Sequence, residues 1–338
     1  MRFSFGQLLL ICVLMVRGVC SATAQTGGPP LENSSGTIRI STNLVLVNVV
    51  ALRWSTSAPG ATLTRDDFEL FDNDRRVPIR TFDTGSATRP LAVWFLVQCS
   101  MSGWGDQGSG LFWGSIGEFR SVLKRNNGSD TYGLAHWCDD GTSDLDVFPS
   151  RDSDPALQKL EQVLSVPVAV RSHDRTGELA LQAALQKIVR ATQSQVPERI
   201  PAVIFLYDDY SAMPKGEADQ FVDQLLRSSI AVYGLRHRRS PRIMDMEWLG
   251  GEKGAIADYI ATQTGGSYLS VRPAQYADGL EQILDELHKR YELGFVPRDL
   301  DGRRHKLRVT LSSDARSRCR STRLAYRSGY IAKRNPIC

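Results

Sequence analysis

Residues 91–103 read LAVWFLVQCSMSG, and this stretch decides which fold to expect. Leu91 to Val97 is an almost continuous apolar run, which indicates a β-strand that is covered on both faces. The chain turns polar at Gln98, and small residues follow it. Strands covered on both faces are typical of parallel sheets, whose ligands bind at the carboxyl ends of the strands.

From Pro90 onward, apolar strands alternate with segments of helical periodicity. We expect further strands at residues 131–137, 145–148, 202–207, 230–235 and 267–271, and helices at residues 111–124, 156–164, 177–189, 218–226, 254–262 and 276–291. This alternation predicts an α/β fold with a doubly wound, mainly parallel sheet.

The two ends of the chain are rich in strands instead. We expect strands at residues 37–54, 68–71 and 77–82 near the start, and at residues 291–296, 305–311 and 322–331 near the end. A stable sheet needs three or more strands with a covered face, so neither end suffices alone. We therefore predict a discontinuous β-sandwich, built from residues 37–87 and from 291–338 with its basic tail. The α/β domain, residues 88–290, is inserted between the two halves.

Residues 1–24 have the features of a signal peptide. Arg2 is followed by the apolar segment Phe5–Val16, and the small residues of 22–24 (ATA) favour cleavage after Ala24. A lipoprotein signal at Cys20 is the alternative. Residues 25–36 then form a flexible lead-in. We expect an exported protein, periplasmic or secreted, with no transmembrane segment in the mature chain.

Cleavage at this point would remove two of the six cysteines. The mature chain would keep four, for which three pairings are possible: Cys99, Cys138, Cys319 and Cys338. An even number of cysteines in an exported chain permits disulfides without fixing which ones form.

Charge is concentrated at the carboxyl-terminal end. The formal charge of the whole chain is +4, but residues 301–338 carry eleven Lys and Arg against only Asp301 and Asp314. Such a tail suits nucleic acid or another anionic surface. Arg316, Arg318 and Arg320 alternate at the period of a strand, which favours a solvated strand face. Export and the lack of interleaved aromatic residues argue against nucleic acid.

The polar residues after the first buried strand resemble part of a known motif. The von Willebrand factor type A domain has a metal-ion-dependent adhesion site whose first loop reads Asp-x-Ser-x-Ser. Ser100 and Ser102 match its two serines, Thr176 matches a threonine of a second loop, and Asp208 matches a distal aspartate. Gln98 occupies the position of the first aspartate.

The resemblance extends to a narrower family, the VWFA-related domain of Acidobacteria, over nearly the whole mature chain. The similar segments are residues 41–47 (STNLVLV), 63–70 (LTRDDFEL), 264–266 (TGG), 291–297 (YELGFVP) and 327–330 (RSGY). This resemblance implies the fold and an extracytoplasmic location, while the biochemical role of the family is largely undefined.

Gln98 makes the implied metal site degenerate. Mg²⁺ takes oxygen ligands that usually include one or two carboxylates, and an amide oxygen is a weaker, neutral ligand. Asp208 is the one clear anionic match. Other carboxylates that could substitute are Asp106, Asp139, Asp140 and Asp209. Two alternatives stay open, namely a hydrogen-bonded cluster without metal and a weak or partner-assisted Mg²⁺ or Mn²⁺ site.

The resemblance also bears on the cysteines. Cys99 and Cys138 follow strands that are neighbours in the von Willebrand A topology, so a Cys99–Cys138 disulfide is expected. Cys319 and Cys338 would then form a second pair. The alternative is four free, partly buried thiols.

Catalytic motifs are missing from the sequence. The histidines have no zinc-like spacing to one another or to cysteines, and the chain contains no Gly-x-Ser-x-Gly and no His-Glu-x-x-His. A hydrolase that uses Ser100 is a remote alternative. We expect an extracytoplasmic protein-interaction or adhesion module whose ligand is an unknown protein of the cell envelope or surface. The second hypothesis is a structural or assembly protein of the envelope whose A domain is a passive insert.

Overall fold

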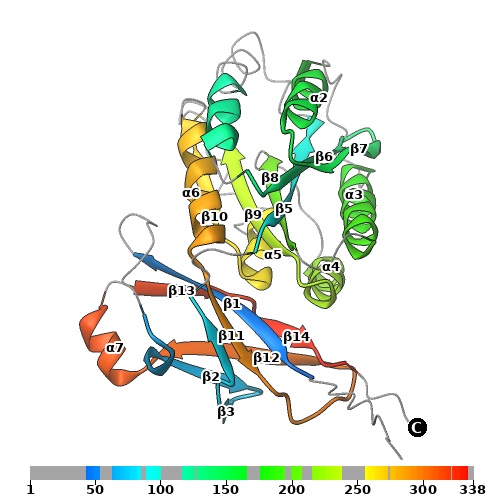
Figure 1. Cartoon of the computed structure of the whole chain (residues 1–338). Coiled ribbons are helices and arrows are strands. Elements are labelled where there is room, and N and C mark those ends of the chain that lie inside the picture. The colour runs from blue at the N-terminus through cyan, green and yellow to red at the C-terminus, as the bar shows by residue number, and fades with distance from the viewer. Residues whose placement is uncertain are drawn as a thin grey trace, which may run out of the picture. The chain divides into compact units, whose positions relative to one another are not determined.

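A computed structural model describes residues 43–53, 63–84, 89–99, 116–125, 128–165, 176–194, 199–207, 215–237, 256–272, 275–320 and 322–333. Its largest sheet consists of β5 (Leu91–Gln98), β6 (Thr131–Trp137), β7 (Ser143–Ser150), β8 (Ile200–Tyr207), β9 (Ala231–His237) and β10 (Tyr268–Val271). The strand order is β10-β9-β8-β5-β6-β7 (Figure 1), and every neighbouring pair is parallel except β6 and β7. Counted along the chain this is the 3-2-1-4-5-6 order of doubly wound folds. The predicted α/β class with a mainly parallel sheet is confirmed.

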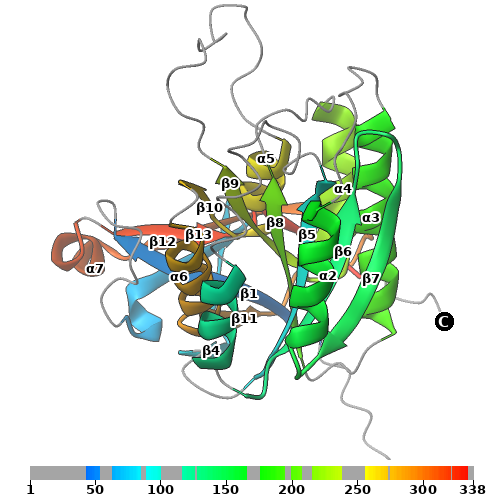
Figure 2. The same cartoon turned by 90° about the horizontal axis from the view of Figure 1, so that it is seen from above.

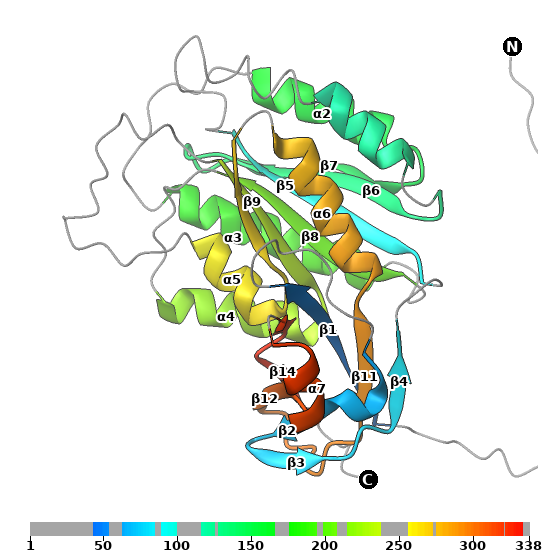
Figure 3. The same cartoon turned by 90° about the vertical axis from the view of Figure 1, so that its left-hand side faces the viewer.

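Helices cover both faces of this sheet. On one face lie α2 (Asp154–Ser165), α6 (Tyr276–His288) and the helical residues 116–125. On the other face lie α3 (Thr176–Gln193), α4 (Lys215–Arg227) and α5 (Ile256–Thr264), as Figures 2 and 3 show. Among the described helices, none combines the length and the apolar character that a membrane span needs.

Strand β5 shows why the deciding stretch is continuously apolar. All of its residues are buried, and side chains alternate between the two faces of a strand. Phe95 and Val97 pack in the core beside α2 and α6, while Trp94 and Leu96 pack in the core beside α3, α4 and α5. Burying one such side chain stabilises the fold by about 1.5–3 kcal/mol.

Two smaller sheets contain strands from both ends of the chain. The first has the order β13-β1-β11-β4, and its strands are β1 (Val45–Arg53), β4 (Thr81–Asp83), β11 (Tyr291–Phe295) and β13 (Thr322–Tyr326). The second has the order β14-β12-β2-β3, and its strands are β2 (Phe68–Asp72), β3 (Arg75–Val77), β12 (Arg304–Leu311) and β14 (Gly329–Ile331). Strand β1 pairs antiparallel with β11 and β13, and β2 pairs antiparallel with β12.

One apolar cluster joins these two sheets. Val47 of β1 and Phe295 of β11 belong to the same buried cluster as Leu70 of β2 and Val309 of β12. The short helix η1 (Arg65–Asp67) leads into β2. Residues far apart in the sequence therefore share a single core here.

The arginine-rich segment corrects the sequence-based interpretation. Arg316 and Arg318 lie in a helix, α7 (Ser313–Arg318), and not on the face of a strand. The side chain of Ser312 accepts a hydrogen bond from the N–H of Ala315, and Ala315 is buried. Capping of this kind stabilises a helix by about 1 kcal/mol. An alternation of three arginines is too short to outweigh the cap and the buried alanine.

The strand expected over residues 322–331 is also divided. It forms β13 and β14, which belong to different sheets. Between them the N–H of Ser328 donates to the carbonyl of Gln263 at 2.9 Å, and Arg327 forms a β-bridge with Thr264. These bonds to the end of α5 divert the backbone, so the strand cannot continue in one sheet.

Candidate functional site

The carboxyl ends of β5, β6 and β8 lie side by side. Gln98 is opposite Trp137 in the register of β5 and β6, and Val97 is opposite Leu206 in the register of β5 and β8. The chain order reverses between β5 and β8. In doubly wound folds this switch point is where ligands bind. The stretch that decides the fold therefore ends at the most favourable position for a site. We call the region at the carboxyl ends of β5, β6 and β8 the carboxyl edge.

A disulfide joins two strands at the carboxyl edge. Cys99 and Cys138 follow β5 and β6 directly, and they are bonded with a Cα–Cα distance of 4.9 Å. This value lies within the usual range of about 4.4–6.8 Å. The structure thus contains the disulfide that was expected at this edge.

The second expected disulfide is not formed, because Cys319 is a free cysteine. Cys319 caps the end of α7, and its side chain is buried in the core that the two smaller sheets share. A small apolar side chain is well placed there, and the thiol faces the core. Cys338 lies outside the described residues.

Beside the disulfide, Gln98 faces a carboxylate. Its side chain is 1% exposed, and its Nε2 lies 3.5 Å from Oδ1 of Asp139. A carboxylate only accepts hydrogen bonds, so the amide presents its NH₂ group to Asp139. The hydroxyl of Thr176 donates to the backbone carbonyl of Asp139 at 2.7 Å. Gln98, Asp139 and Thr176 form a polar cluster at the carboxyl edge.

The beginning of α3 lies close to the same aspartate. Gly177 is the second residue of this helix, and a Cβ at its position would lie 3.0 Å from Oδ1 of Asp139. The free N–H groups at the start of a helix favour a nearby negative charge. The first turn of α3 therefore lies against Asp139.

Asp140 has a different role. Its Oδ1 accepts from the N–H of Thr142 at 2.9 Å and from the Thr142 hydroxyl at 2.7 Å. These hydrogen bonds hold the pKa of the Asp140 carboxyl below its usual value. Asp140 organises the turn between β6 and β7, and of the two neighbouring aspartates it is Asp139 that contacts Gln98 and Thr176.

The other predicted site residues fall outside the described part of the chain. These residues are Ser100, Ser102, Asp208, Asp106 and Asp209. Among the described residues of the edge, Asp139 is the carboxylate that faces Gln98. Of the four predicted metal ligands, Thr176 is the one that the structure describes, and its hydroxyl bonds to the backbone of Asp139.

The structure also brings together residues that sequence spacing did not connect. One ligand atom each of Cys99, His136 and Cys138 lies within 4.8 Å of the others, and Nδ1 of His136 lies 2.6 Å from Asp146. The sequence shows no zinc-like spacing of these residues, and their proximity comes from the pairing of β5 with β6. Zinc binds thiolates, and a disulfide offers none, so the oxidised pair does not hold a metal with His136.

A second polar cluster, which sequence reasoning missed, lies where β8 ends. Tyr207 is opposite Arg236 in the register of β8 and β9. The hydroxyl of Tyr207 donates to Asp258, and Arg236 pairs with the same carboxylate at 3.0 Å. Asp258 belongs to α5, so only the packing of that helix shows the connection. Charges of opposite sign meet here and fix the sheet edge in place.

No protein-family model and no curated protein sequence matches the chain. Among solved structures, the protein BatB from Bacteroides thetaiotaomicron is 15% identical, with a TM-score of 0.39 over 59% of this chain and 99% of that one. The SpRpn10 VWA domain is 12% identical, with a TM-score of 0.37 over 59% and 93%. A von Willebrand factor type A protein from Catenulispora acidiphila is 9% identical, with a TM-score of 0.41 over 84% and 76%.

At these identities and TM-scores, no residue role or function of those proteins is transferred to this chain. The fold assignment rests on the strand order and on the helices that cover both faces of the sheet. Two of these three proteins, SpRpn10 and the protein from Catenulispora acidiphila, are named for their von Willebrand factor type A domains. The solved structures to which this chain is similar thus include von Willebrand factor type A domain proteins.

Proposed function

We propose that the protein is an exported protein-interaction module whose binding face is the carboxyl edge of the six-stranded sheet. The observation that carries the proposal is the polar cluster of Gln98, Asp139 and Thr176 at the switch point, held next to the Cys99–Cys138 disulfide. Rigid polar groups lower the entropic cost of binding a partner. In this proposal the edge is a degenerate metal-ion-dependent adhesion site that recognises its partner without a resident metal.

Two observations support export. The apolar segment Phe5–Val16 is followed by small residues, as in a signal peptide. The Cys99–Cys138 disulfide suits an oxidising compartment, because cytosolic thiols are kept reduced. The partner in this proposal is a protein of the cell envelope or surface.

Three described histidines are each held by a carboxylate. His136 lies beside Asp146, and His288 lies beside Asp130. His305 lies between two carboxylates in the smaller sheets. In this proposal these histidines have structural roles, because each contact joins two segments of the fold.

We also propose that the two smaller sheets form one β-sandwich, interrupted by an α/β domain at residues 88–290. The antiparallel pairings of β1 with β11 and of β2 with β12 support it, as does their common core. The α/β segment has its own apolar clusters on both faces of its sheet.

Residues 88–290 expressed alone should therefore fold cooperatively, because their core does not depend on the sandwich. Circular dichroism and urea unfolding would show a single transition and a helical spectrum. Residues 37–87 expressed alone are the control, and they should stay unfolded because they lack β11 and β12. A disordered 88–290 fragment would contradict the domain boundaries.

Metal titration tests the proposed site. We expect the wild-type protein to bind Mn²⁺ weakly or not at all in calorimetric titration, and Gln98→Asp to strengthen binding about tenfold or more, because it adds a second carboxylate. Without metal, the same change should lower stability slightly, since two close carboxylates repel each other.

Two further variants control this experiment. Gln158→Asp on the exposed side of α2 adds the same charge away from the edge and should leave Mn²⁺ binding unchanged. Adding Asp208→Ala to Gln98→Asp should abolish the gain. Tight binding by the wild type that survives Asp208→Ala would place the metal elsewhere.

Partner capture separates this proposal from an assembly role with a passive α/β domain. The purified mature protein, immobilised, should retain a partner from a native envelope fraction, and Asp139→Ala should lose it without loss of fold. Gln158→Ala is the matched control. If Asp139→Ala and Asp208→Ala both retain the partner, the binding face is not the carboxyl edge.

A further inference from the structure

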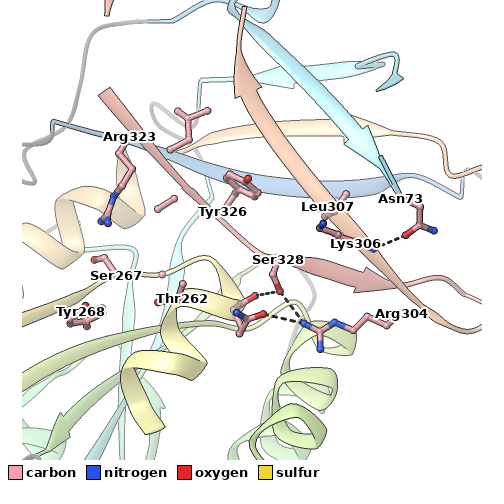
Figure 4. Close-up of a pocket in the computed structure, with 14 residues that line it drawn as sticks. Asn73, Thr262, Ser267, Tyr268, Arg304, Lys306, Leu307, Arg323, Tyr326 and Ser328 are labelled. Carbon is pink, nitrogen blue, oxygen red and sulfur yellow. Dashed lines mark hydrogen bonds between the residues drawn. The ribbon is translucent and has the colours of Figure 1, made fainter. Parts of the chain in front are cut away.

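A groove lies between the start of β10 and the smaller sheets (Figure 4), and it is therefore at the amino ends of the parallel strands. It is a cavity of about 850 Å³, within the size range of ligand sites. Its lining residues come from the end of α5 and the start of β10 on one side and from β12 and β13 on the other. The residues that matter below are Lys306, Arg323, Arg304, Tyr268 and Tyr326.

The groove runs along the edge of a strand. Residues 323–326 all line it, and they are consecutive residues of β13. Side chains of a strand alternate between its two faces, so four consecutive lining residues mean that the cavity meets the strand along its backbone edge. β13 is the outermost strand of its sheet, and its described pairing is with β1 alone. Such an edge offers free N–H and C=O groups to an added strand.

The opposite wall includes the start of another outermost strand. β10 is the outermost strand of the six-stranded sheet and pairs with β9. The consecutive residues 266–268 line the groove where β10 begins. An extended segment lying here would have the edge of β13 on one side and the start of β10 on the other.

The lining is positively charged. None of its fourteen described residues is acidic. Arg304 is compensated, because it pairs with Asp223 at 3.1 Å. Lys306 and Arg323 are exposed, and neither makes an ion pair with a described residue. Burial raises the pKa of the nearby Glu286 carboxyl, and the charge of Arg323 acts against this rise.

The groove is held in shape at one end. Ser328 donates its N–H to the carbonyl of Gln263, and Arg304 donates to the side chains of Gln263 and Ser328 at 3.2 and 3.0 Å (Figure 4). Gly265 has φ of 90°, and a Cβ there would lie 2.4 Å from the backbone nitrogen of Arg327. These contacts fix the spacing of the two walls, so a ligand does not have to create it.

We propose that this groove binds an acidic, extended segment of a partner protein, which adds as a strand to the free edge of β13. Main-chain hydrogen bonds would supply affinity, and Lys306 and Arg323 would select acidic side chains. The two tyrosines, Tyr268 and Tyr326, provide apolar surface for the remaining side chains. This site is separate from the carboxyl edge, so the tests of the groove do not depend on the function proposed above.

The probe is a fluorescein-labelled peptide of about eight residues that alternates glutamate and valine, the length of a typical strand. Fluorescence anisotropy in about 50 mM salt, where screening is modest, measures its binding to the full mature chain. We expect the double variant Lys306→Glu/Arg323→Glu to bind about tenfold more weakly. The matched control Arg320→Glu/Lys333→Glu reverses two exposed charges that do not line the groove, and it should change binding by less than about twofold.

A second pair of peptides tests strand addition itself. In an extended peptide, the N–H groups of alternate residues point to the same side. N-methylation of one alternating set should abolish binding, while N-methylation of the other set should be tolerated. If both methylated peptides bind as well as the parent, the peptide does not pair with β13 and the proposal is wrong.

Three other outcomes would overturn the proposal. Equal weakening by the control double variant would mean unspecific charge attraction. A single-stranded oligonucleotide that displaces the peptide and binds more tightly would make nucleic acid the occupant. A wild-type dimer in sedimentation that dissociates in Lys306→Glu/Arg323→Glu would make a second copy of this chain the occupant.

Discussion

Asp72→Ala should lower the free energy of unfolding by about 3–5 kcal/mol, because it breaks a buried polar network in the smaller sheets. Asp72 is 6% exposed, and its two oxygens each lie 3.0 Å from a partner, Nδ1 of His305 and the hydroxyl of Tyr330. His305 and Tyr330 are themselves 3% and 2% exposed. Removal of the carboxylate leaves both groups without this acceptor and away from water.

The network explains why the effect should be large. Asp72 ends β2, His305 belongs to β12 and Tyr330 to β14, so one carboxylate ties three strands together. Burial, and then the charge of Asp72, raise the pKa of the Tyr330 hydroxyl, which therefore remains a neutral donor. The second ring nitrogen of His305 is 3.2 Å from Asp301.

Equilibrium urea unfolding followed by circular dichroism measures the loss, with an unchanged m-value as the sign that only stability changed. Asp285→Ala is the matched control. Its carboxylate makes an exposed i,i+4 pair with Lys289 on α6, which contributes about 0.5 kcal/mol or less. If Asp72→Ala is no less stable than Asp285→Ala, the network does not hold these strands together.

The second large effect concerns the disulfide. Replacement of both Cys99 and Cys138 by serine should destabilise the protein by about 4 kcal/mol. The two cysteines are 39 residues apart in sequence, and the bond restricts that loop in the unfolded chain. Because the loop contains β6 and the helix at residues 116–125, its freedom in the unfolded state is considerable.

Urea midpoints with and without dithiothreitol measure this effect. The wild type should lose stability on reduction, and the double serine variant should be less stable and indifferent to the reductant. Cys319→Ser is the control, because Cys319 has a free, buried thiol and its replacement should leave the response to reductant intact. An unchanged midpoint of fully reduced wild-type protein would contradict the prediction.

The local apolar pattern of the sequence predicted most elements of the α/β part, because the pattern within each element depends on which of its faces are buried. The expected strand at residues 131–137 coincides with β6, and the apolar run from Leu91 ends within one residue of β5. Parallel strands covered on both faces leave a continuous apolar run, which is the least ambiguous signal a sequence offers. The register of β5 with β6 and β8 then places Gln98 at the edge of the sheet.

The local sequence pattern predicted the wrong structure where a few specific contacts determined the path of the backbone. Arg316 and Arg318 alternate like residues of a strand, but the cap at Ser312 makes them helical. Residues 322–331 have one continuous strand-like character, but bonds to the end of α5 divide them between two sheets. Each of these contacts involves one or two hydrogen bonds, which apolar periodicity does not report.

By itself, the sequence determined the α/β class, the buried strand that leads to Gln98, and the positions of Cys99 and Cys138 at strand ends. Only the tertiary structure decided that Gln98 faces Asp139, that His136 lies beside the disulfide, and that a cationic groove separates β10 from β13. The physical reason is that periodicity records which side of each element is buried. The distance between side chains on different elements is set by packing, and it is these distances that make a cluster or a groove.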